Sequence, residues 1–496
     1  MTQSYDADVA IVGYGPTGVT AALTLAGNGV RAVALERDKD LYPRARAVTV
    51  DDWTMRIFQD IGIDERIEKK IDPQRALRWI TYDGTELVRV DRPGSDLGRA
   101  ARAYNIYQPT MEAELREAAR EYGVTVHYGE EVTGIEQDAD GVTVTSTDTV
   151  TGGTRTLRAR YAIGADGGSG PTRGRIGRRL LGDTGEVTWV VIDCRVKRWW
   201  PDRDVLTFWS DKERPVVDIA LSAGNHRWEI PLKPDETPAD YPTGAEVWPL
   251  LEALGVTPDD VEIHQHAFYR HHVRMADSWR TGRVFLAGDA AHLMPPWAGA
   301  GMQTGMRDAH DLGWKLARVL KGELPESWLD TYEAERRPSA AFYTALAVDL
   351  GQVIKQEKSG MESELNAPPL LSGGWVRGPV GGGSIVGRMV PQPVVGDSRG
   401  RMTRLDDLLG HDFVLLGDDL DPTTLLSERE KAGWDALGAR YVAVRPRTSY
   451  TRGPDELVDL DEVLLSWLRR HGARAVALRP DKFVAAADTH GLAVPA

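Results

Sequence analysis

Cysteine is almost absent from the sequence, since Cys194 is the only one among 496 residues. A single thiol excludes an intrachain disulfide, and it excludes a thiolate cluster for zinc or an iron–sulfur centre. A chain without disulfides is typical of a reducing compartment, and we therefore expect this protein in the cytoplasm.

Long apolar runs and excess positive charge are also absent. No uninterrupted apolar stretch reaches the ~18 residues of a membrane-spanning helix, and the opening residues MTQSYD lack the features of a signal peptide. There are 60 Lys and Arg against 74 Asp and Glu, a formal net charge of −14. This charge repels phosphate backbones and anionic bilayers, so we expect neither nucleic acid nor a membrane as a partner.

What is present begins with a strand–helix–strand pattern. Residues 7–13 form an apolar run that ends in glycine, 17–29 have helical spacing, and 31–36 form a second apolar run that ends in an acid. The first turn matches GxGxxG, the pattern of a dinucleotide-binding Rossmann unit. The predicted cofactor contacts are Gly13, Gly15, Pro16, Thr17, Gly18, Glu36 and Arg37.

Each glycine of this motif has a physical role. Gly13 permits the tight turn, Gly15 lets backbone amides approach a pyrophosphate, and Gly18 lets helix and strand pack closely. The helix N-terminus faces the anion, because its unpaired amides and its dipole favour negative charge. We expect Glu36 to accept hydrogen bonds from the adenosine ribose.

A second motif occupies residues 282–292, GRVFLAGDAAH, a strand that ends at a Gly-Asp pair and is followed by Pro295-Pro296. This segment resembles the second FAD fingerprint of the single-component (class A) FAD-dependent aromatic hydroxylases, which share the p-hydroxybenzoate hydroxylase fold. The likeness is greatest to the 3-(3-hydroxyphenyl)propionate and phenol hydroxylase type, and it covers most of the chain.

The resemblance implies the rest of an FAD site. By it, Asp289 binds the ribityl hydroxyls and the loop of residues 295–302 surrounds the isoalloxazine, where amide donors would stabilise the anionic reduced flavin. The loop residues expected at the ring are Pro296, Gly299, Ala300, Gly301 and Met302. Arg46, Gln108 and Asp166 match further family positions near the cofactor, although an Asp-Gly pair such as 166–167 is more often only a turn.

The resemblance also implies the reaction. NADH or NADPH reduces FAD, and the reduced flavin reacts with O2 to give a C4a-hydroperoxyflavin that passes OH to a phenolic or related aromatic ring. A proton acceptor should lie near the phenol; the resemblance implies the Pro296 carbonyl, and the sequence alone suggests His272. Trp297 and Trp228 are candidate substrate contacts, although large aromatics in a sheet are more often core packing.

Several alternatives remain open. The chain could be an FAD-dependent oxidoreductase without oxygen insertion, or it could perform Baeyer–Villiger or epoxidase chemistry on the same scaffold. The segment 228–231 matches half of a halogenase motif, but it fits the RWE strand of the hydroxylases equally well. Four histidines, His264, His266, His271 and His272, have strand spacing that could chelate a metal, yet no carboxylate is spaced to complete a site, so we expect none.

The length of the chain predicts two or three domains, because single domains cluster at roughly 100 to 200 residues. We expect an α/β fold in which a Rossmann-type FAD-binding domain is interleaved with a β-sheet substrate domain, followed by a small thioredoxin-like domain. The expected ranges are 1–185 and 273–360 for FAD, 186–272 for substrate, 361–395 for a linker and 396–496 for the C-terminal domain. The last lacks a CxxC motif, so we expect it to be structural or to form a homodimer.

Overall fold

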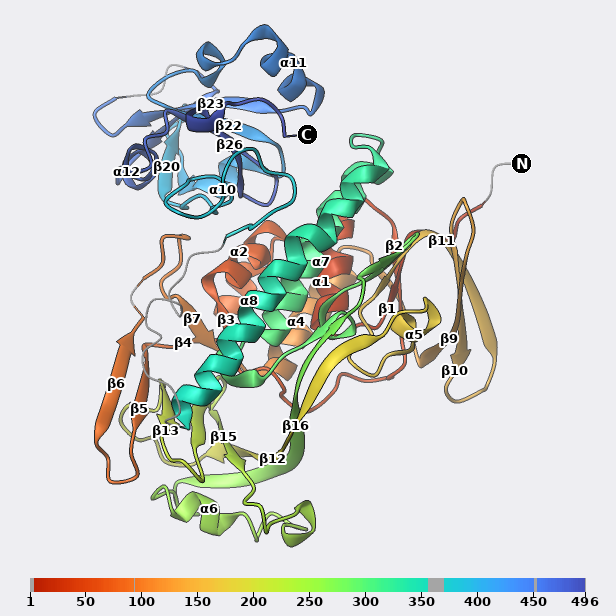
Figure 1. Ribbon diagram of the computed structural model, residues 1–496, viewed down its shortest axis with the longest axis vertical. Helices are drawn as coiled ribbons and strands as arrows, with labels where there is room; N and C mark the ends of the chain where they lie inside the picture. Colours follow the sequence, from red (N-terminus) through yellow and green to blue (C-terminus); the bar gives the residue numbers. More distant parts are fainter. Residues whose placement is uncertain (1–3, 93, 356–369, 450–452, 496) are drawn as a thin grey trace. The chain divides into compact units, whose positions relative to one another are not determined.

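The computed structural model describes residues 4–92, 94–355, 370–449 and 453–495 (Figure 1). They form two compact units, each built from several segments of the chain. The first takes its described residues from 1–94, 100–310 and 341–366, and the second takes them from 95–99, 311–340 and 367–496. None of the helices in the described chain combines the length and the hydropathy that crossing a bilayer would require.

An eight-stranded sheet carries the glycine motif in the first unit. Its main path is β17-β18-β11-β1-β2-β8, and β10 and β9 extend it from β11 as an antiparallel meander. β1 lies parallel to both neighbours, with Val9 opposite Ala32 and Tyr161. The strands are β1 Ala7–Val12, β2 Ala32–Glu36, β8 Thr125–Tyr128, β9 Glu130–Gln137, β10 Val142–Asp148, β11 Thr154–Gly164, β17 Arg280–Thr281 and β18 Val284–Leu286.

The helix α1, Pro16–Gly27, connects β1 to β2 and confirms the predicted strand–helix–strand unit. Gly15 is its N-cap and Pro16 occupies its first position, where a missing N–H costs no intrahelical bond. The helix is buried from Gly18 to Leu25, because small and aliphatic residues let it lie close against the sheet. The sequence motif therefore ends at a helix N-terminus.

A second eight-stranded sheet has the order β19-β16-β12-β15-β14-β13-β5-β6. Two long antiparallel strands, β12 and β16, run through it (Figure 1). The strands are β5 Ala76–Ile80, β6 Glu86–Asp91, β12 Leu180–Val196, β13 Val205–Trp209, β14 Val216–Leu221, β15 Asn225–Pro231, β16 Val261–Ala276 and β19 His292–Leu293. Residues 76–91 thus join a sheet whose other strands mostly come from the expected substrate domain, 186–272.

Short elements complete the first unit. A three-stranded sheet contains β3 Thr49–Asp51, β4 Asp72–Pro73 and β7 Ala103–Asn105. The helices are α2 Asp52–Asp60, α3 Asp64–Glu68, α4 Gln108–Glu121, α5 Pro171–Arg175 and α6 Trp248–Glu252. Two longer helices, α7 Gly301–Leu320 and α8 Thr331–Ile354, contribute residues to both units.

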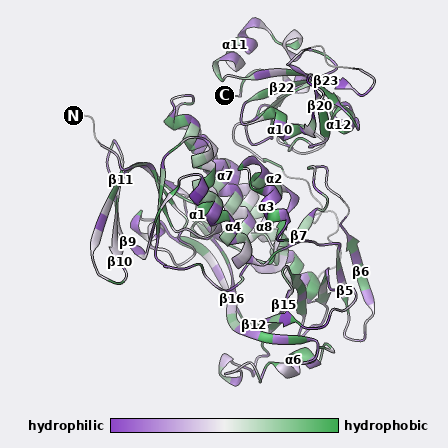
Figure 2. Ribbon diagram, turned by 180° about the vertical axis from the view of Figure 1, so that it is seen from behind, coloured by the Kyte–Doolittle hydropathy of each residue, from purple (hydrophilic) through white to green (hydrophobic). Residues whose placement is uncertain are grey.

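The second unit is built on a seven-stranded mixed sheet of order β21-β20-β24-β23-β22-β25-β26. Its strands are β20 Val394–Asp397, β21 Met402–Arg404, β22 Val414–Asp418, β23 Arg440–Pro446, β24 Glu456–Asp459, β25 Ala475–Leu478 and β26 Val484–Ala487. Its own helices are α10 Leu405–Leu409, α11 Glu428–Ala436 and α12 Val463–Arg470. α11 is largely hydrophilic in Figure 2, and Trp434 is its buried residue.

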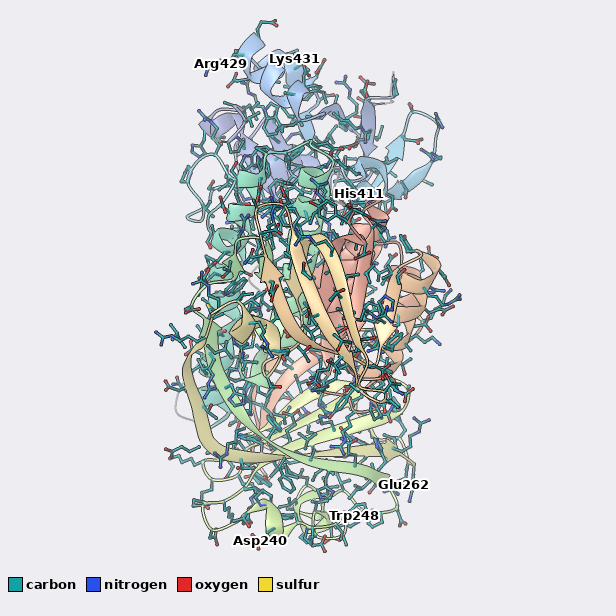
Figure 3. All side chains as sticks on the ribbon, turned by 90° about the vertical axis from the view of Figure 1, so that its right-hand side faces the viewer. Asp240, Trp248, Glu262, His411, Arg429 and Lys431 are labelled. Atoms are coloured by element: carbon teal, nitrogen blue, oxygen red, sulfur yellow. The ribbon has the colours of Figure 1, made fainter. Side chains whose placement is uncertain are left out.

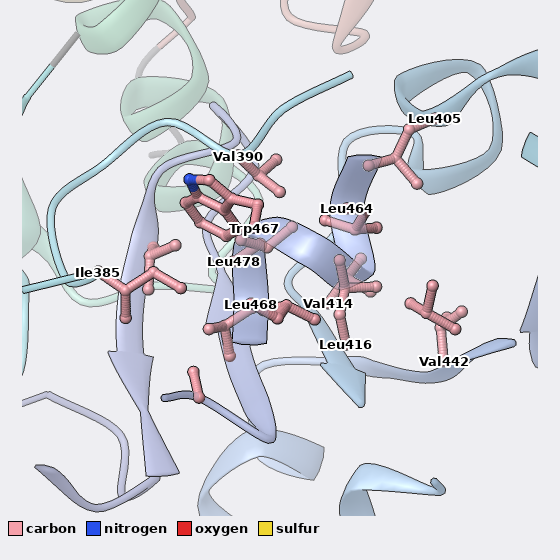
Figure 4. Packing of buried hydrophobic residues seen from close by; sticks show 14 of the residues in the cluster. Ile385, Val390, Leu405, Val414, Leu416, Val442, Leu464, Trp467, Leu468 and Leu478 are labelled. Carbon is pink, nitrogen blue, oxygen red and sulfur yellow. The ribbon is translucent and has the colours of Figure 1, made fainter. Parts of the chain in front are cut away.

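The segment expected to be a linker, 361–395, falls partly outside the described residues. Its described part, 370–395, supplies buried side chains to the second unit. Ile385 and Val390 belong to the same core cluster as Leu464 and Trp467 of α12 (Figure 4). The apolar residues of this glycine-rich stretch therefore pack in the core of the unit.

Candidate active site

A cavity of about 700 Å³ lies within the first unit, where the two large sheets contribute to its walls. The predicted cofactor residues Gly13, Gly15, Pro16, Thr17, Glu36, Arg37, Arg46, Gln108, Asp166, Asp289, Pro296, Gly299, Ala300, Gly301 and Met302 all line it. Gly18 does not line it, because it is buried in α1 against the preceding turn. One cavity thus collects residues that are almost 300 positions apart in the chain.

The glycine motif is shaped for a close ligand. Gly13 has φ +90°, and a Cβ there would lie 2.5 Å from the Ala165 carbonyl oxygen. A Cβ on Gly18 would lie 2.1 Å from the Gly13 carbonyl oxygen, so the helix can approach only because that atom is missing. At Gly15 a Cβ would meet nothing within 4 Å, which leaves open space for a phosphate beside the N-terminus of α1.

Acidic groups beside the motif complete the nucleotide end. Glu36 accepts a hydrogen bond from the Tyr14 amide at 2.6 Å and remains at the cavity wall. Asp166 accepts from the Thr172 amide at 2.8 Å through Oδ2, whereas its buried Oδ1 has no partner among the described residues. Burial raises the pKa of Asp166. An orphaned carboxylate oxygen at a cavity is satisfied by a ligand hydroxyl, as the ribose or ribityl chain of FAD would provide.

Asp289 is held at the cavity by a buried anchor on α7. β18, which precedes it, is fully buried and pairs with β11. Oδ2 of Asp308 accepts from the Gly288 amide at 3.1 Å and lies 2.7 Å from Nε2 of His292. No pattern in the sequence pointed to Asp308, because it is sixteen residues beyond His292 and only the folded loop brings them together.

The loop before α7 presents a positive helix end to the cavity. Gly299 has φ +60°. The Gln303 side chain donates to the Gly299 carbonyl at 2.7 Å and accepts from the Asp51 amide at 2.7 Å, and it thereby links the loop to β3. Gly301 and Met302 begin α7 and line the cavity. The first amides of a helix have no intrahelical acceptor, and they stabilise nearby negative charge. This geometry fits the anionic edge of a reduced flavin.

Gln108 has a role that the sequence did not indicate. Its Oε1 accepts hydrogen bonds from the amides of Arg46 at 2.9 Å and Ala47 at 2.8 Å. From the other side, Arg227 donates to the carbonyls of Ala45 and Arg46. The loop that places Arg46 at the cavity is therefore fixed on both of its faces.

The far end of the cavity is mostly apolar. Its wall includes Leu77, Leu206, Phe208, Val217, Ile219, Trp297 and Leu350. Trp297 packs edge-on against Trp189, with ring centroids 4.6 Å apart. Such a wall suits an aromatic ring and excludes water.

Trp228 and His272 are not brought to this cavity. Trp228 is fully buried in a core cluster with Ile192 and Ile230. Because side chains alternate along a strand, the next residue of β15, Glu229, faces the cavity instead. His272 lies with Nδ1 2.9 Å from Oγ1 of Thr184.

His271, the neighbour of His272, packs beside the cavity wall. Its ring centroid lies 5.2 Å from Trp189 and 5.1 Å from Trp297. Burial lowers the pKa of His271 to about 4, so its ring is neutral. The described residues contain no group of three His, Cys, Asp or Glu side chains that could hold a metal ion.

Two ionisable residues that line the cavity, Glu229 and Arg92, were not predicted from the sequence. Glu229 is buried at the wall and accepts a 2.7 Å hydrogen bond from the Tyr269 hydroxyl. Arg92 donates through Nη1 to Oε1 of Gln74 at 2.8 Å and forms no ion pair with the described residues. Burial lowers the pKa of Arg92 to about 10, which leaves it charged at neutral pH.

Comparisons with known proteins agree with this cofactor geometry. Residues 6–347 match the family of FAD binding domains, and residues 387–494 match the HcaD C-terminal domain. A 3-(3-hydroxy-phenyl)propionate/3-hydroxycinnamic acid hydroxylase of Mycolicibacterium smegmatis is 35% identical over 97% of this chain and 90% of its own. One from Burkholderia cenocepacia is 34% identical, over 98% of this chain and 94% of its own.

Solved structures share the fold over nearly the whole chain. The flavin-dependent monooxygenase PieE, in complex with FAD and substrate, has a TM-score of 0.82 at 23% identity and covers 98% of this chain and 96% of its own. Aklavinone-11 hydroxylase, with FAD and aklavinone, has a TM-score of 0.80 at 25% identity with the same coverage. The chain belongs to the FAD-dependent aromatic hydroxylases, which are flavoprotein monooxygenases.

Proposed function

We propose that this enzyme hydroxylates a phenol that carries a carboxylate side chain, with O2 and either NADH or NADPH as co-substrates. The relatives with 34–35% identity are named for 3-(3-hydroxyphenyl)propionate and 3-hydroxycinnamic acid, which are phenols of this kind. Arg92 carries the proposal, because a cation that lines the cavity without an ion pair to the described residues favours an anionic ligand.

Different residues along the cavity would bind the cofactor and the substrate. The α1 N-terminus and Gly15 would hold the pyrophosphate of FAD, and Asp289 and Asp166 would accept from its hydroxyls. When bound, FAD supplies the activation of O2. The apolar wall keeps water away and lays the substrate ring against the flavin side of the cavity, while Arg92 fixes the direction of the side chain.

We also propose how the chain divides into domains. We propose a Rossmann-type FAD domain of residues 1–185 and 273–360, with 186–272 as the substrate domain. A thioredoxin-like domain of 396–496 would be structural or would form a homodimer, because the chain's single cysteine, Cys194, lies outside it. The carbonyl of Pro296 already accepts from the Gly299 amide at 2.7 Å, which leaves it less available to a substrate.

A substrate panel tests the proposed function. Purified enzyme with FAD is supplied with NADH or NADPH and with 3-(3-hydroxyphenyl)propionate, 3-hydroxycinnamate, neutral 3-ethylphenol or a polycyclic phenol, while oxygen uptake and product mass are recorded. We expect the two acids to accelerate NAD(P)H oxidation and to give products heavier by one oxygen. Equal kcat/KM for 3-ethylphenol, or turnover that continues without O2, would contradict the proposal.

A further inference from the structure

A cluster of ionisable side chains lies where β12, β15 and β16 adjoin. Arg227 forms two hydrogen bonds with Asp193, from Nε at 2.7 Å and from Nη2 at 2.9 Å. All of these side chains are buried, and the charge of the guanidinium is thereby matched by one carboxylate. A second carboxylate in the same cluster, Glu229, forms only a longer ion pair of 3.7 Å with the same Arg227.

The two oxygens of Glu229 differ in their surroundings. Oε2 accepts the 2.7 Å hydrogen bond from Tyr269, whereas Oε1 accepts none from the described residues and lies 3.7 Å from the nearest Arg227 nitrogen. Glu229 also lines the cavity, beside the apolar wall for the substrate ring. One carboxylate oxygen is thus available to a ligand.

The electrostatic setting of Glu229 shifts its pKa upward. Burial raises the pKa of Glu229, while Arg227 and the Tyr269 hydroxyl oppose that rise and Asp193 adds to it. A carboxyl group with a raised pKa is a stronger base than an ordinary one once it is ionised. Arg227 belongs to β15, Tyr269 to β16 and Asp193 to β12, whereas β14 on the other side of β15 places the apolar Val217 opposite Glu229.

We propose that Glu229 accepts the proton of the substrate's phenol, and that Tyr269 positions its carboxylate for this transfer. The O–H bond of the phenol breaks, its proton moves to Oε1, and the electron pair remains on the phenolic oxygen, which makes the ring more electron-rich. The ring carbon that receives OH then loses its hydrogen as a proton, and the electron pair of that C–H bond restores the aromatic ring. Oε1 returns its proton to the phenolic oxygen, while the proton from the ring leaves in the water formed from the second oxygen atom of O2. This assignment rests on the proposed function, and it replaces the candidate acceptors His272 and Pro296.

Glu229→Gln tests the proposal, because glutamine keeps the shape and an acceptor for Tyr269 but cannot take a proton at this oxygen. We expect the rate of product formation to fall by about 100-fold, the lower end of what a positioned base contributes. Flavin content and substrate-stimulated NAD(P)H oxidation should stay, so that oxygen is consumed without hydroxylation. Glu262→Gln is the matched control on β16, since Glu262 is exposed (Figure 3) and absent from the cavity wall.

The pH profile separates a base from a structural carboxylate. In the natural enzyme, product formation should rise with pH as Glu229 ionises, and this limb should be absent in Glu229→Gln. A fluorinated, more acidic phenol should restore part of the variant's rate, because it loses its proton without help. Tyr269→Phe removes a donor to the ionised form, so the limb should move to higher pH.

The outcomes distinguish this inference from the proposed function. If the natural enzyme hydroxylates the phenolic acids while Glu229→Gln keeps the same rate and the same limb, Glu229 is not the acceptor and only this inference falls. If the rising limb of the pH profile does not move in Tyr269→Phe, Tyr269 does not position the carboxylate of Glu229. If the natural enzyme forms no hydroxylated product from any phenol, the proposed function fails and the inference fails with it.

Discussion

A single residue, Arg92, supports the proposal that the substrate is an anion. It follows β6 and lines the cavity, where its guanidinium donates to the Gln74 side chain, while Asp51 and Asp52 act on its pKa through space. Arg92 is half-buried and forms no ion pair with the described residues, so a ligand that supplies an anion would stabilise it. Its position therefore limits the substrate class more sharply than the apolar wall does.

Arg92→Met should weaken the enzyme selectively. A hydrogen bond to a charged group contributes about 1.5–3 kcal/mol, so we expect KM for phenolic acids to rise roughly tenfold to a hundredfold. The KM for 3-ethylphenol should hardly change. Steady-state kinetics with both substrates checks this, and Arg89→Met is the control, because Arg89 lies on β6 and pairs with Asp91 at 3.0 Å outside the cavity. Equal losses for acid and neutral phenol would indicate a structural role.

At the scale of elements, the start of α7 depends on a close approach to β3. A Cβ on Gly299 would lie 2.4 Å from Cγ2 of Thr49 and 3.8 Å from its Cβ, so the conflict involves one methyl group. The Thr49 hydroxyl, in contrast, donates to the Tyr104 carbonyl at 2.9 Å. Serine at position 49 would remove the methyl group and keep that bond.

Gly299→Ala should therefore weaken FAD binding, and Thr49→Ser should partly rescue it. Alanine adds the contact with Thr49 and a left-handed backbone that costs about 1–2 kcal/mol. In the double variant only the backbone cost should remain. FAD dissociation constants and melting temperatures of the four proteins give the coupling between the two positions. Additive losses would show that the methyl contact is not the cause.

Sequence patterns were informative where function depends on neighbours in the chain. The β1–α1–β2 unit follows from apolar spacing around Gly13, Gly15 and Gly18, and the cavity contains most of the residues that the motifs indicated. The positions of Glu229 and Arg92 at the cavity were not predicted, because they depend on which strands pair. The same alternation that places Glu229 at the cavity turns Trp228 into the core, and one residue of register decides between them.

At the scale of the whole molecule, the second unit joins distant segments through buried charges. Lys315 of α7 and Arg479 after β25 both bond to Glu335 of α8, at 2.6 Å and 2.8 Å, and Arg479 also bonds to Asp481 at 2.7 Å. Although burial opposes it, Arg479 and Lys315 hold the pKa of Glu335 at about 2. The network therefore ties residues 311–340 to the C-terminal sheet of the same unit.

Arg479→Met should destabilise the second unit by about 3–5 kcal/mol, because it leaves buried carboxylates without their cation. The pKa of Glu335 is lower in the folded chain than its ordinary 4.5, so its contribution is complete above that pH and is lost as pH falls toward about 2. The difference between the two proteins should accordingly shrink below pH 4.5. Urea unfolding at several pH values measures it. Arg474→Met is the control, because Arg474 is exposed and its ion pair with Asp488 should contribute little to stability. A loss that did not depend on pH would mean that Arg479 acts through packing and not through its charge.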